Sequence, residues 1–436
     1  MAKRTLPSSG RKRVVSGMRP TGRLHLGHYF GALQNWLKLQ EEYECFFFVA
    51  DWHALTTHYE DTSSVAENTL QVTMDWLSVG LDPAKATLFI QSSILEHAEL
   101  HLLLSMITPL SWLERVPTYK EQIENLKDRD LGTYGFLGYP LLQSADIVIY
   151  DADLVPVGED QVPHVELTRE IVRRFNTHFG LEISPELYLP ANETVLGTIL
   201  KTLELKDAMD MAKKYGISEM KPGIGNKYPA ELRAFFGAAL RKRIAEIGFA
   251  NWIEQCSPYQ RSVRQLIRPR VVLREPDVML TETPRLPGTD GRRMAKSYGN
   301  AIWLSDPPDE IRTKVRNMMT DPQRQRRTDP GRPEVCPVFA WHKLFSPPET
   351  IAWSDHGCRT AGIGCIECKA AMADNLIKWI EPIQARRKEF EAHPEKVWSI
   401  LDAGGKKAHH AARRTMKRVR NAIFKWDEAR KPAGGN

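Results

Sequence analysis

Strand-like and helix-like segments alternate between residues 14 and 183, and this alternation limits the possible folds more than any other feature of the sequence. The apolar runs "CFFFVADWHAL" and "ATLFIQSS" lie on either side of the helical pattern "SVAENTLQVTMDWLSVGL". A further buried strand is predicted within "ADIVIYDADLVPVGEDQ", followed by the helix "HVELTREIVRRFNTHF". Because crossover helices join parallel strands, this pattern predicts an α/β fold built on a doubly wound parallel sheet.

The rest of the chain is predicted to be mainly helical. Helical patterns such as "LKTLELKDAMDMAKKYG" and "AELRAFFGAALRKRIAEIGFANWIEQ" follow the α/β part, and a loop-rich break is expected at "FSPPETIAWSDHGCRTAGIGC". We therefore expect a flexible basic tail at 1–13, the α/β part at 14–183, a mostly helical connecting insertion at 184–283, a loop region at 284–310 and a helical C-terminal part at 311–436.

The turn "SGMRPTGRLHLGHYFGAL", residues 16–33, has the composition of a phosphate or nucleotide site. Gly22 and Gly27 would let a ligand approach the backbone closely. His25 and His28 place hydrogen-bond donors at the start of the following helix, where the helix dipole favours anions. Both this turn and residues 155–161 are predicted to lie at carboxyl ends of strands, where doubly wound sheets bind their ligands.

A second candidate site is the glycine-flanked loop "GRRMAKSYGN", residues 291–300. It carries three cations, Arg292, Arg293 and Lys296, and the hydroxyl of Ser297. A mobile cationic loop can close over phosphates and stabilise charge that develops in a transition state. On these residues alone, a basic surface loop without a ligand is the favoured interpretation.

The charge and hydropathy of the chain limit its partners and its location. The net charge is +6, and basic residues concentrate in runs at 312–332 and 406–425, which are expected either to attract polyanions or to form solvated helix faces. No apolar run approaches the ~18 residues of a membrane span. The N-terminus "MAKRTLPSSGRKR" lacks the apolar core of a secretory signal, so we expect a cytoplasmic protein without membrane contact.

Three separated motifs, "HLGH", "VPVGEDQ" and "RMAKS", occur in an order that resembles the class I aminoacyl-tRNA synthetases, and the first and third resemble the HIGH and KMSKS signatures of that family. "YPLLQSADIVIY" followed by "DLVPVGEDQVPHVELTREIVRRFN" is similar to the tryptophanyl-tRNA synthetases in particular. The resemblance spans residues 14–183 and resumes at 284. It implies a Rossmann-like catalytic domain at 14–183, a catalytic signature loop at 284–310, a helical C-terminal tRNA/anticodon-binding domain at 311–436, and a homodimer.

The resemblance also implies an activity in two steps. The carboxylate of L-tryptophan attacks the α-phosphate of ATP, with Mg²⁺ on the departing pyrophosphate, and the resulting adenylate is transferred to tRNA(Trp). By the same resemblance, the catalytic residues are Lys296, Arg293, His28 and His25. The ATP-binding residues are Arg19, Pro20, Thr21, Gly27, His28, Gly158, Glu159, Asp160, Leu286, Arg293, Met294, Ala295, Lys296 and Ser297.

The tryptophan-binding residues implied by the resemblance are Asp146, Tyr139, Gln143, Gln161, His53 and Gly17. Asp146 is expected to accept a hydrogen bond from the indole N–H, which is only a donor. Tyr139 and Gln161 are expected to contact the α-amino group, and His53 and Gly17 to shape the pocket. Two purely structural alternatives remain open. In the first, Asp146 caps a helix or pairs with a basic residue. In the second, Tyr139 is part of the core.

Some residues depart from the family pattern. Gln143 stands where the family often has Met, and its spacing to Asp146 is similar to that of the tyrosyl enzymes. Arg293 and Ala295 replace the first Lys and first Ser of KMSKS, so one hydroxyl is lost. The alternatives are therefore a tyrosine–tRNA ligase, a nucleotidyltransferase that does not act on tRNA, and a non-catalytic RNA-binding paralogue that senses iron.

Four of the six cysteines form the pattern C-x₂₁-C-x₆-C-x₂-C, at Cys336, Cys358, Cys365 and Cys368. Four thiolates suit a tetrahedral Zn²⁺ or an iron–sulfur cluster. Some bacterial tryptophanyl-tRNA synthetases are similar, with a C-x₂₂-C-x₆-C-x₂-C pattern that holds a [4Fe–4S] cluster. The resemblance implies a [4Fe–4S] cluster here, with Zn²⁺ or unligated thiols as the alternatives, and Cys45 is expected to be a core residue.

Overall fold

The computed structural model describes residues 10–117, 132–203, 230–281 and 286–426. Its centre is a five-stranded sheet in the order β3-β2-β1-β4-β7, in which every pairing is parallel. The strands are β1 (Arg13–Met18), β2 (Glu44–Val49), β3 (Ala86–Ile90), β4 (Leu154–Val157) and β7 (Asp277–Leu280). The direction of the strand order reverses between β1 and β4, which is where doubly wound sheets bind ligands. The predicted Rossmann-like parallel sheet is confirmed.

Helices cover both faces of this sheet, because the side chains of its buried strands alternate between two cores. Val14 of β1 belongs to one core and Val15 to the other. The helices that connect the strands of the catalytic half are α1 (Leu26–His28), α2 (Gln34–Glu42), α3 (Asp51–His58), α4 (Val65–Val79), α5 (Glu96–Ser105), α6 (Leu110–Glu114), α8 (Tyr134–Leu137), α9 (Tyr139–Val148) and α10 (Val162–Phe179), with a π-helical turn at Tyr29–Leu33.

Two local predictions were wrong. The segment "ADIVIY" was expected within a strand, but residues 145–148 end α9 and the strand β4 begins only at Leu154. Both states bury the same apolar side chains, so a short apolar run does not separate them. The predicted loop-rich break at residues 345–365 is largely helical, because α18 (Pro348–Arg359) occupies most of it. Pro348 is at the start of α18, where proline is compatible with a helix.

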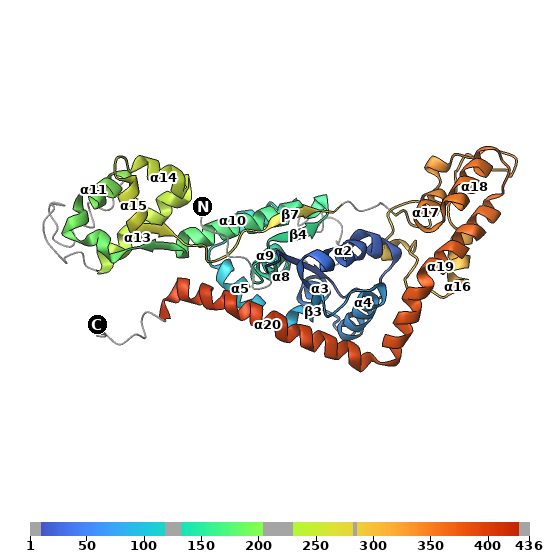
Figure 1. Ribbon diagram of the computed structural model, residues 1–436, viewed down its shortest axis with the longest axis horizontal. Coiled ribbons are helices and arrows are strands. Elements are labelled where there is room, and N and C mark those ends of the chain that lie inside the picture. The colour runs from blue at the N-terminus through green and yellow to red at the C-terminus, as the bar shows by residue number, and fades with distance from the viewer. Residues whose placement is uncertain (1–9, 118–131, 204–229, 282–285, 427–436) are drawn as a thin grey trace.

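A subdomain with its own hydrophobic core interrupts the connection between α10 and β7. This core is formed by side chains of α11 (Glu193–Thr202), α13 (Ala230–Ile247), α14 (Phe249–Gln255) and α15 (Gln260–Leu266). An antiparallel pair, β5 (Leu181–Ile183) and β6 (Ile267–Pro269), closes its base, and the N–H of Arg270 donates to the carbonyl of Gly180 at 2.7 Å. Figure 1 shows this subdomain at one end of the elongated molecule. Most of the predicted helix "LKTLELKDAMDMAKKYG" lies outside the described residues.

Four of the C-terminal helices form the opposite end of the molecule (Figure 1). They are α16 (Pro308–Arg316), α17 (Pro337–Phe345), α18 and α19 (Cys365–Ala392), and the last helix is α20 (Pro394–Phe424). The long helix α20 returns to the sheet and packs along its edge strand β3 (Figure 1). Gly404 makes this possible, because a Cβ at that position would lie 1.8 Å from the carbonyl oxygen of Leu88.

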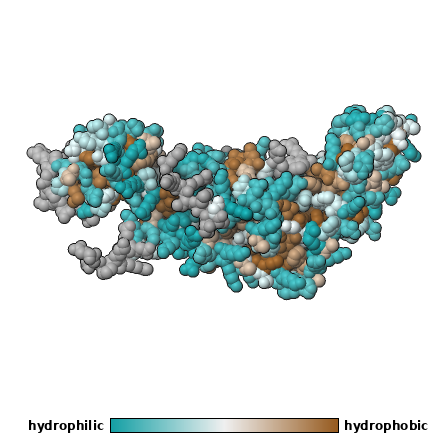
Figure 2. All heavy atoms as spheres, viewed as in Figure 1, coloured by the Kyte–Doolittle hydropathy of each residue, from teal (hydrophilic) through white to brown (hydrophobic). Residues whose placement is uncertain are grey.

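On the face drawn in Figure 2, hydrophilic side chains cover both ends and much of the centre, with hydrophobic side chains between them. Within the described ranges, no helix combines the length and the apolar character that crossing a lipid bilayer requires.

Candidate active site

The predicted phosphate turn lies directly after β1, at the reversal of the strand order. His25 caps α1, and its backbone N–H donates to Nδ1 of His28 at 3.2 Å. The two imidazole rings are 3.8 Å apart between centroids. Asp75 of α4 fixes the turn from behind, because its carboxylate accepts from the Leu24 N–H at 2.7 Å and pairs with Arg387 of α19. The turn is therefore held rigidly between the sheet and the C-terminal helices.

The signature loop packs against this turn, although the two are more than 260 residues apart in the chain. The Gly27 N–H donates to the sulfur of Met294 at 3.4 Å. Lys296 Nζ donates to the carbonyl of Thr21 at 3.2 Å, and it also lies 5.8 Å from the centroid of the Trp303 ring. The structure thus brings Lys296, His25 and His28 to one place, with Arg293 exposed on the same loop.

Asn300, which the sequence reasoning missed, holds the signature loop in shape. It is 2% exposed, and its side-chain amide donates to Asp290 and to the carbonyl of Arg293. Its oxygen accepts from the Ala295 N–H at 2.9 Å. Leu286 and Met294 are buried at the root of the loop, while Arg293, Lys296 and Ser297 are exposed. A loop whose base is held in place and whose cationic side chains are exposed is suited to close over an anion.

Both histidines of the turn are neutral at physiological pH. Burial, followed by the effect of nearby cations including the Arg293 guanidinium, lowers the pKa of His25 to about 4 and the pKa of His28 to about 3. A neutral imidazole offers one N–H donor and one acceptor. These rings can therefore donate hydrogen bonds to phosphate oxygens, while the positive charge at the site comes from Arg293 and Lys296.

The second predicted nucleotide segment follows β4 at the same edge of the sheet. Gly158 precedes a short helical turn, Glu159–Gln161, whose carboxylates are exposed. A Cβ at Gly158 would lie 2.8 Å from the carboxylate of Asp160, which in turn accepts from the Gln161 amide at 3.0 Å. Exposed carboxylates at this edge can accept hydrogen bonds from ribose hydroxyls. Arg19 and Thr21 are exposed beside them, and Pro20 is buried.

Asp146 lies at the centre of a buried polar network, and three protein side chains contact its carboxylate. Oδ1 is 2.6 Å from His97 Nδ1, Oδ2 is 2.7 Å from His53 Nε2, and Gln91 Nε2 is 2.9 Å from both oxygens. Burial alone would raise the pKa of Asp146, but the hydrogen bonds from His53 and His97 outweigh it and hold the pKa well below its usual range. Asp146 is therefore an ionised acceptor rather than a helix cap.

The other predicted tryptophan-binding residues surround this network. The hydroxyl of Tyr139 is 3.1 Å from Nε2 of His164, and its ring is half-buried. Gln143 and Gln161 are also half-buried, on α9 and just before α10. Gly17 lies at the end of β1, where a Cβ would be 2.5 Å from the Phe48 ring. The structure therefore places Gly17 at the end of β1, Gln161 after β4, and Tyr139 and Gln143 on the helix that carries Asp146.

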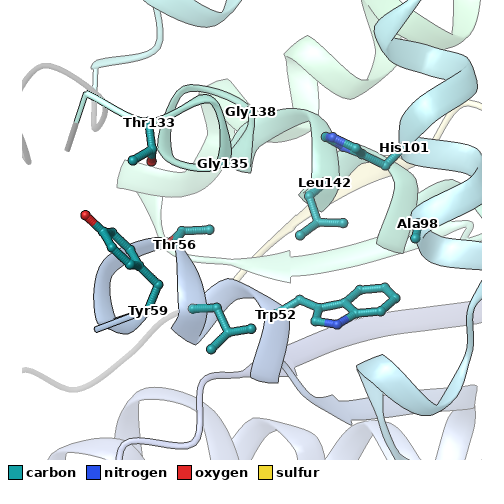
Figure 3. Close-up of a pocket in the computed structure, with 10 residues that line it drawn as sticks. Trp52, Thr56, Tyr59, Ala98, His101, Thr133, Gly135, Gly138 and Leu142 are labelled. Atoms are coloured by element: carbon teal, nitrogen blue, oxygen red, sulfur yellow. The ribbon is translucent and has the colours of Figure 1, made fainter. Parts of the chain in front are cut away.

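A largely apolar cavity of about 390 Å³ lies between α3, α5, α8 and α9, and neither Asp146 nor any of the described side chains in contact with its carboxylate lines it. Trp52 and Tyr59 line it on the α3 side, and Gly138 and Leu142 line it from the other side (Figure 3). The ring of His101 completes the wall on α5, and its Nδ1 is buried without a hydrogen bond among the described residues (Figure 3). Sequence reasoning gave no indication of this cavity.

The four cysteines predicted as metal ligands share one neighbourhood in the C-terminal helices. Cys336 precedes α17, Cys358 lies near the end of α18, and Cys365 and Cys368 start α19. Burial is the main cause that raises the pKa of Cys368 to about 11, with smaller contributions from the other three cysteines. Within the described ranges, however, no three His, Cys, Asp or Glu side chains are close enough together to hold a metal ion.

The comparisons with known proteins match this arrangement over almost the whole chain. The family of tRNA synthetases class I (W and Y) matches residues 8–210 and 253–381. A tryptophan–tRNA ligase of Ralstonia nicotianae is 49% identical and the match covers 94% of this chain and 98% of that protein. The chain belongs to the tryptophan–tRNA ligase family of class I tRNA synthetases. A second member of this family, from Thermotoga maritima, is 42% identical, with the match covering 94% of this chain and 98% of the relative.

Solved structures of the family support the fold. A tryptophanyl-tRNA synthetase from Campylobacter jejuni has a TM-score of 0.64 at 25% identity, covering 95% of this chain and 99% of that chain. The same enzyme complexed with ADP and tryptophan has a TM-score of 0.67 at 24% identity, covering 94% and 99%. Residues 211–252, which include α13, lie between the two parts of the chain that the family model matches.

Proposed function

We propose that the chain activates L-tryptophan with ATP and transfers it to tRNA(Trp). The observation that carries this proposal is the packing of the "RMAKS" loop against the "HLGH" turn at the reversal of the strand order, beside the buried Asp146. Membership of the tryptophan–tRNA ligase family supports the same activity. ATP and tryptophan would meet between the ends of β1 and β4.

In the first step, the tryptophan carboxylate attacks the α-phosphate of ATP in line and pyrophosphate leaves. This reaction needs positioning and charge neutralisation more than covalent help. Lys296 and Arg293 would stabilise the charge on the departing phosphates, and neutral His25 and His28 would donate hydrogen bonds to them. Mg²⁺, when bound to the nucleotide, supplies further neutralising charge. Gly27 would leave space for the nucleotide, with Glu159 and Asp160 at the ribose and Leu286 near the adenine.

In the second step, a ribose hydroxyl at the 3′ end of the tRNA attacks the adenylate. Support for an RNA partner comes from α20, where Lys406, Lys407, Arg413, Arg414 and Lys417 are exposed and recur on one side of the helix. The C-terminal helices, within the proposed limits 311–436, would form the anticodon-binding part. Since tRNA charging serves protein synthesis, we also infer a cytoplasmic location.

A pyrophosphate exchange assay on a Lys296→Ala variant tests this function. Removing the ammonium should slow tryptophan-dependent ATP–pyrophosphate exchange by roughly 10²–10³-fold, because preorganised charge at a phosphoryl transition state contributes that much. The dissociation constant for tryptophan should stay nearly unchanged. Arg292→Ala is the matched control, because Arg292 pairs with Asp290 and lies 4.6 Å from the Tyr298 ring, away from the turn.

Three results would contradict the proposal in different ways. Exchange that depends only on tyrosine would make the chain a tyrosine–tRNA ligase. Exchange with tryptophan but no charging of tRNA(Trp) would favour a nucleotidyltransferase that does not act on tRNA. A large loss of tryptophan affinity in Lys296→Ala would contradict the role given to this residue.

We further infer that the protein is a homodimer, as its resemblance to the family implies. Support comes from a row of exposed apolar side chains on α5 and at its two ends, at Leu95, Leu102 and Met106, and from Leu110 at the start of α6. Leu95, Leu102 and Met106 recur on one face of α5, and Leu102 is 55% exposed. Such a patch is typical of a surface that another protein covers. The cavity between α3 and α5 opens beside the same helix.

We also infer, from the resemblance alone, that Cys336, Cys358, Cys365 and Cys368 hold a [4Fe–4S] cluster. Four thiols are donors of the right chemical type for such a cluster, and the Arg324 guanidinium is 3.6 Å from the Cys358 sulfur. A Cβ at Gly331 would lie 2.5 Å from the same sulfur, so this position suits only glycine. Iron and acid-labile sulfide analysis of anaerobically purified protein tests the inference, and zinc instead of iron would reject it.

A further inference from the structure

The carboxylate of Asp146 has no acceptor position left for a substrate. An ionised carboxylate has about four lone-pair sites. Here His97 and Gln91 approach Oδ1, while His53 and Gln91 approach Oδ2, all between 2.6 and 2.9 Å. Asp146 is also only 1% exposed without any substrate present. An indole N–H can therefore reach this carboxylate only if one of its protein donors leaves.

Two of the three donors, His97 and Gln91, are each held by a second hydrogen bond in addition to the one to Asp146. The second ring nitrogen of His97 is 2.6 Å from the hydroxyl of Tyr150, and the His97 side chain is 0% exposed. The side-chain oxygen of Gln91 accepts a hydrogen bond from the Trp52 N–H at 3.1 Å. This bond orients the Gln91 side-chain amide so that its nitrogen faces Asp146. Moving either residue would break a second buried hydrogen bond, which is costly.

His53 is the donor that can leave. Its side chain is 13% exposed, whereas Asp146 and His97 are 2% and 0% exposed at their side chains. In the described part of the chain, its ring makes a single hydrogen bond, from Nε2 to Asp146. The hydroxyl of Thr56 donates to the backbone carbonyl of His53 and leaves the ring free to turn. Rotation of this ring would open one acceptor position on Oδ2.

We propose that His53 is a stand-in donor, which the indole N–H of tryptophan displaces from Asp146 when the substrate binds. This inference rests on the proposed function and deepens it, because it assigns the amino-acid specificity to an exchange of donors. A ring with an N–H group restores the fourth hydrogen bond of the carboxylate after His53 has moved. A ring without this donor leaves a buried acceptor unpaired, or leaves His53 in place and clashes with it.

Substitution of His53 by leucine gives a sharp test, because it removes the competing donor and keeps an apolar group of similar size. The substrates are tryptophan and benzothienylalanine, in which sulfur replaces the indole N–H. Without the competitor, neither ligand has to displace a hydrogen bond, so the dissociation constants of tryptophan and of the analogue should both fall about tenfold, with their ratio unchanged. His53→Gln retains a side-chain N–H donor and should keep both dissociation constants near those of the unmodified protein.

Two other results would overturn the proposal. A loss of affinity for tryptophan alone in His53→Leu, with the ratio of the two constants falling towards one, would mean that His53 itself accepts the indole N–H. Unchanged or weaker binding of both ligands would mean that His53 supports the pocket without taking part in an exchange. Both results differ from failure of the proposed function, in which the unmodified protein would show no tryptophan-dependent pyrophosphate exchange.

A second measurement on the unmodified protein does not depend on the folding of a variant. With ¹⁵N-labelled histidine, NMR should show the Nε2–H proton of His53 in its hydrogen bond to a carboxylate. Adding tryptophan should abolish this signal, and adding benzothienylalanine should leave it in place. The signal of His97 should persist throughout and serves as the internal control. A His53 signal that survives saturation with tryptophan would reject the exchange.

Discussion

His25 and His164 are buried and His28 is half-buried, and their removal from water lowers the pKa of each to between about 3 and about 4. In the unfolded chain, each would take up its proton near pH 6.5. Between these values the unfolded state binds more protons, so the free energy of unfolding falls as the pH falls. Their contribution is complete above about pH 6.5 and is lost towards pH 3 to 4.

The variant His28→Asn isolates this effect at one residue. Asparagine keeps a polar side chain at the turn but does not titrate. Relative to this variant, the unmodified protein should lose stability below about pH 6.5, by at most about 1.4 kcal/mol per pH unit. Urea unfolding of both proteins from pH 7 to pH 4.5 measures the difference. A difference that does not change with pH would mean that His28 is not held neutral.

At the scale of single residues, the sequence was enough to identify candidate functional side chains that belong to a short, recognisable motif. His25, His28 and Lys296 belong to such motifs, and the structure brings them together across the chain. Gln91 and His97 could not be found in this way, because their importance comes from a carboxylate about 50 residues later. A weak signal existed, since Gln91 directly follows a predicted strand at its carboxyl end.

Among the elements, the contact of α20 with the edge strand β3 depends on one glycine. Gly404→Ala would place a methyl group within 1.8 Å of the Leu88 carbonyl oxygen, so helix and strand must separate. We expect a loss of about 2 kcal/mol in the free energy of unfolding, typical of overpacking. Gly405→Ala is the matched control, since its Cβ would meet only the Ser93 hydroxyl, at 3.4 Å. It should be neutral or stabilise by up to about 1 kcal/mol.

Thermal and urea unfolding of the two variants compare these positions directly. Equal stability of the two would show that α20 does not rest on the backbone of β3. Partial unfolding of Gly404→Ala, with loss of α20 alone, would be visible as a first transition in circular dichroism.

The elements themselves were predictable where a strong apolar run or a long helical period defined them. The strands β2 and β3 and the helices α4 and α10 occur where the sequence placed them. The prediction failed at residues 145–150, where the run "ADIVIY" is too short to show a period, and in α18, where glycine and proline obscure a helix. The strand β7 lies more than 110 residues beyond β4, and local patterns do not reveal such a pairing.

At the scale of the molecule, the sheet and the C-terminal helices share one hydrophobic core. Leu24 of the phosphate turn, Met294 of the signature loop and Leu376 of α19 all belong to it. The ion pair between Asp75 and Arg387 lies at the same junction. A displacement of α19 therefore reaches the nucleotide turn directly. No sequence pattern indicated this continuity, because it depends on how distant segments pack together.

The exposed row on α5 yields a prediction for the assembly. Leu102→Asp puts a charge into the proposed dimer contact and should convert the protein to a monomer at micromolar concentration. Val271→Asp is the control, because Val271 is 59% exposed and Leu102 is 55% exposed. Size-exclusion chromatography with light scattering measures the mass of each variant. A dimer that persists in Leu102→Asp, or a monomeric unmodified protein, would contradict the proposed surface.

The base of the subdomain at residues 181–269 has a consequence for the history of the family. The chain enters the subdomain at Gly180 and leaves it at Arg270, and a backbone hydrogen bond joins these two residues. A single insertion or deletion could therefore add or remove the whole subdomain without changing the connection of any strand in the central sheet.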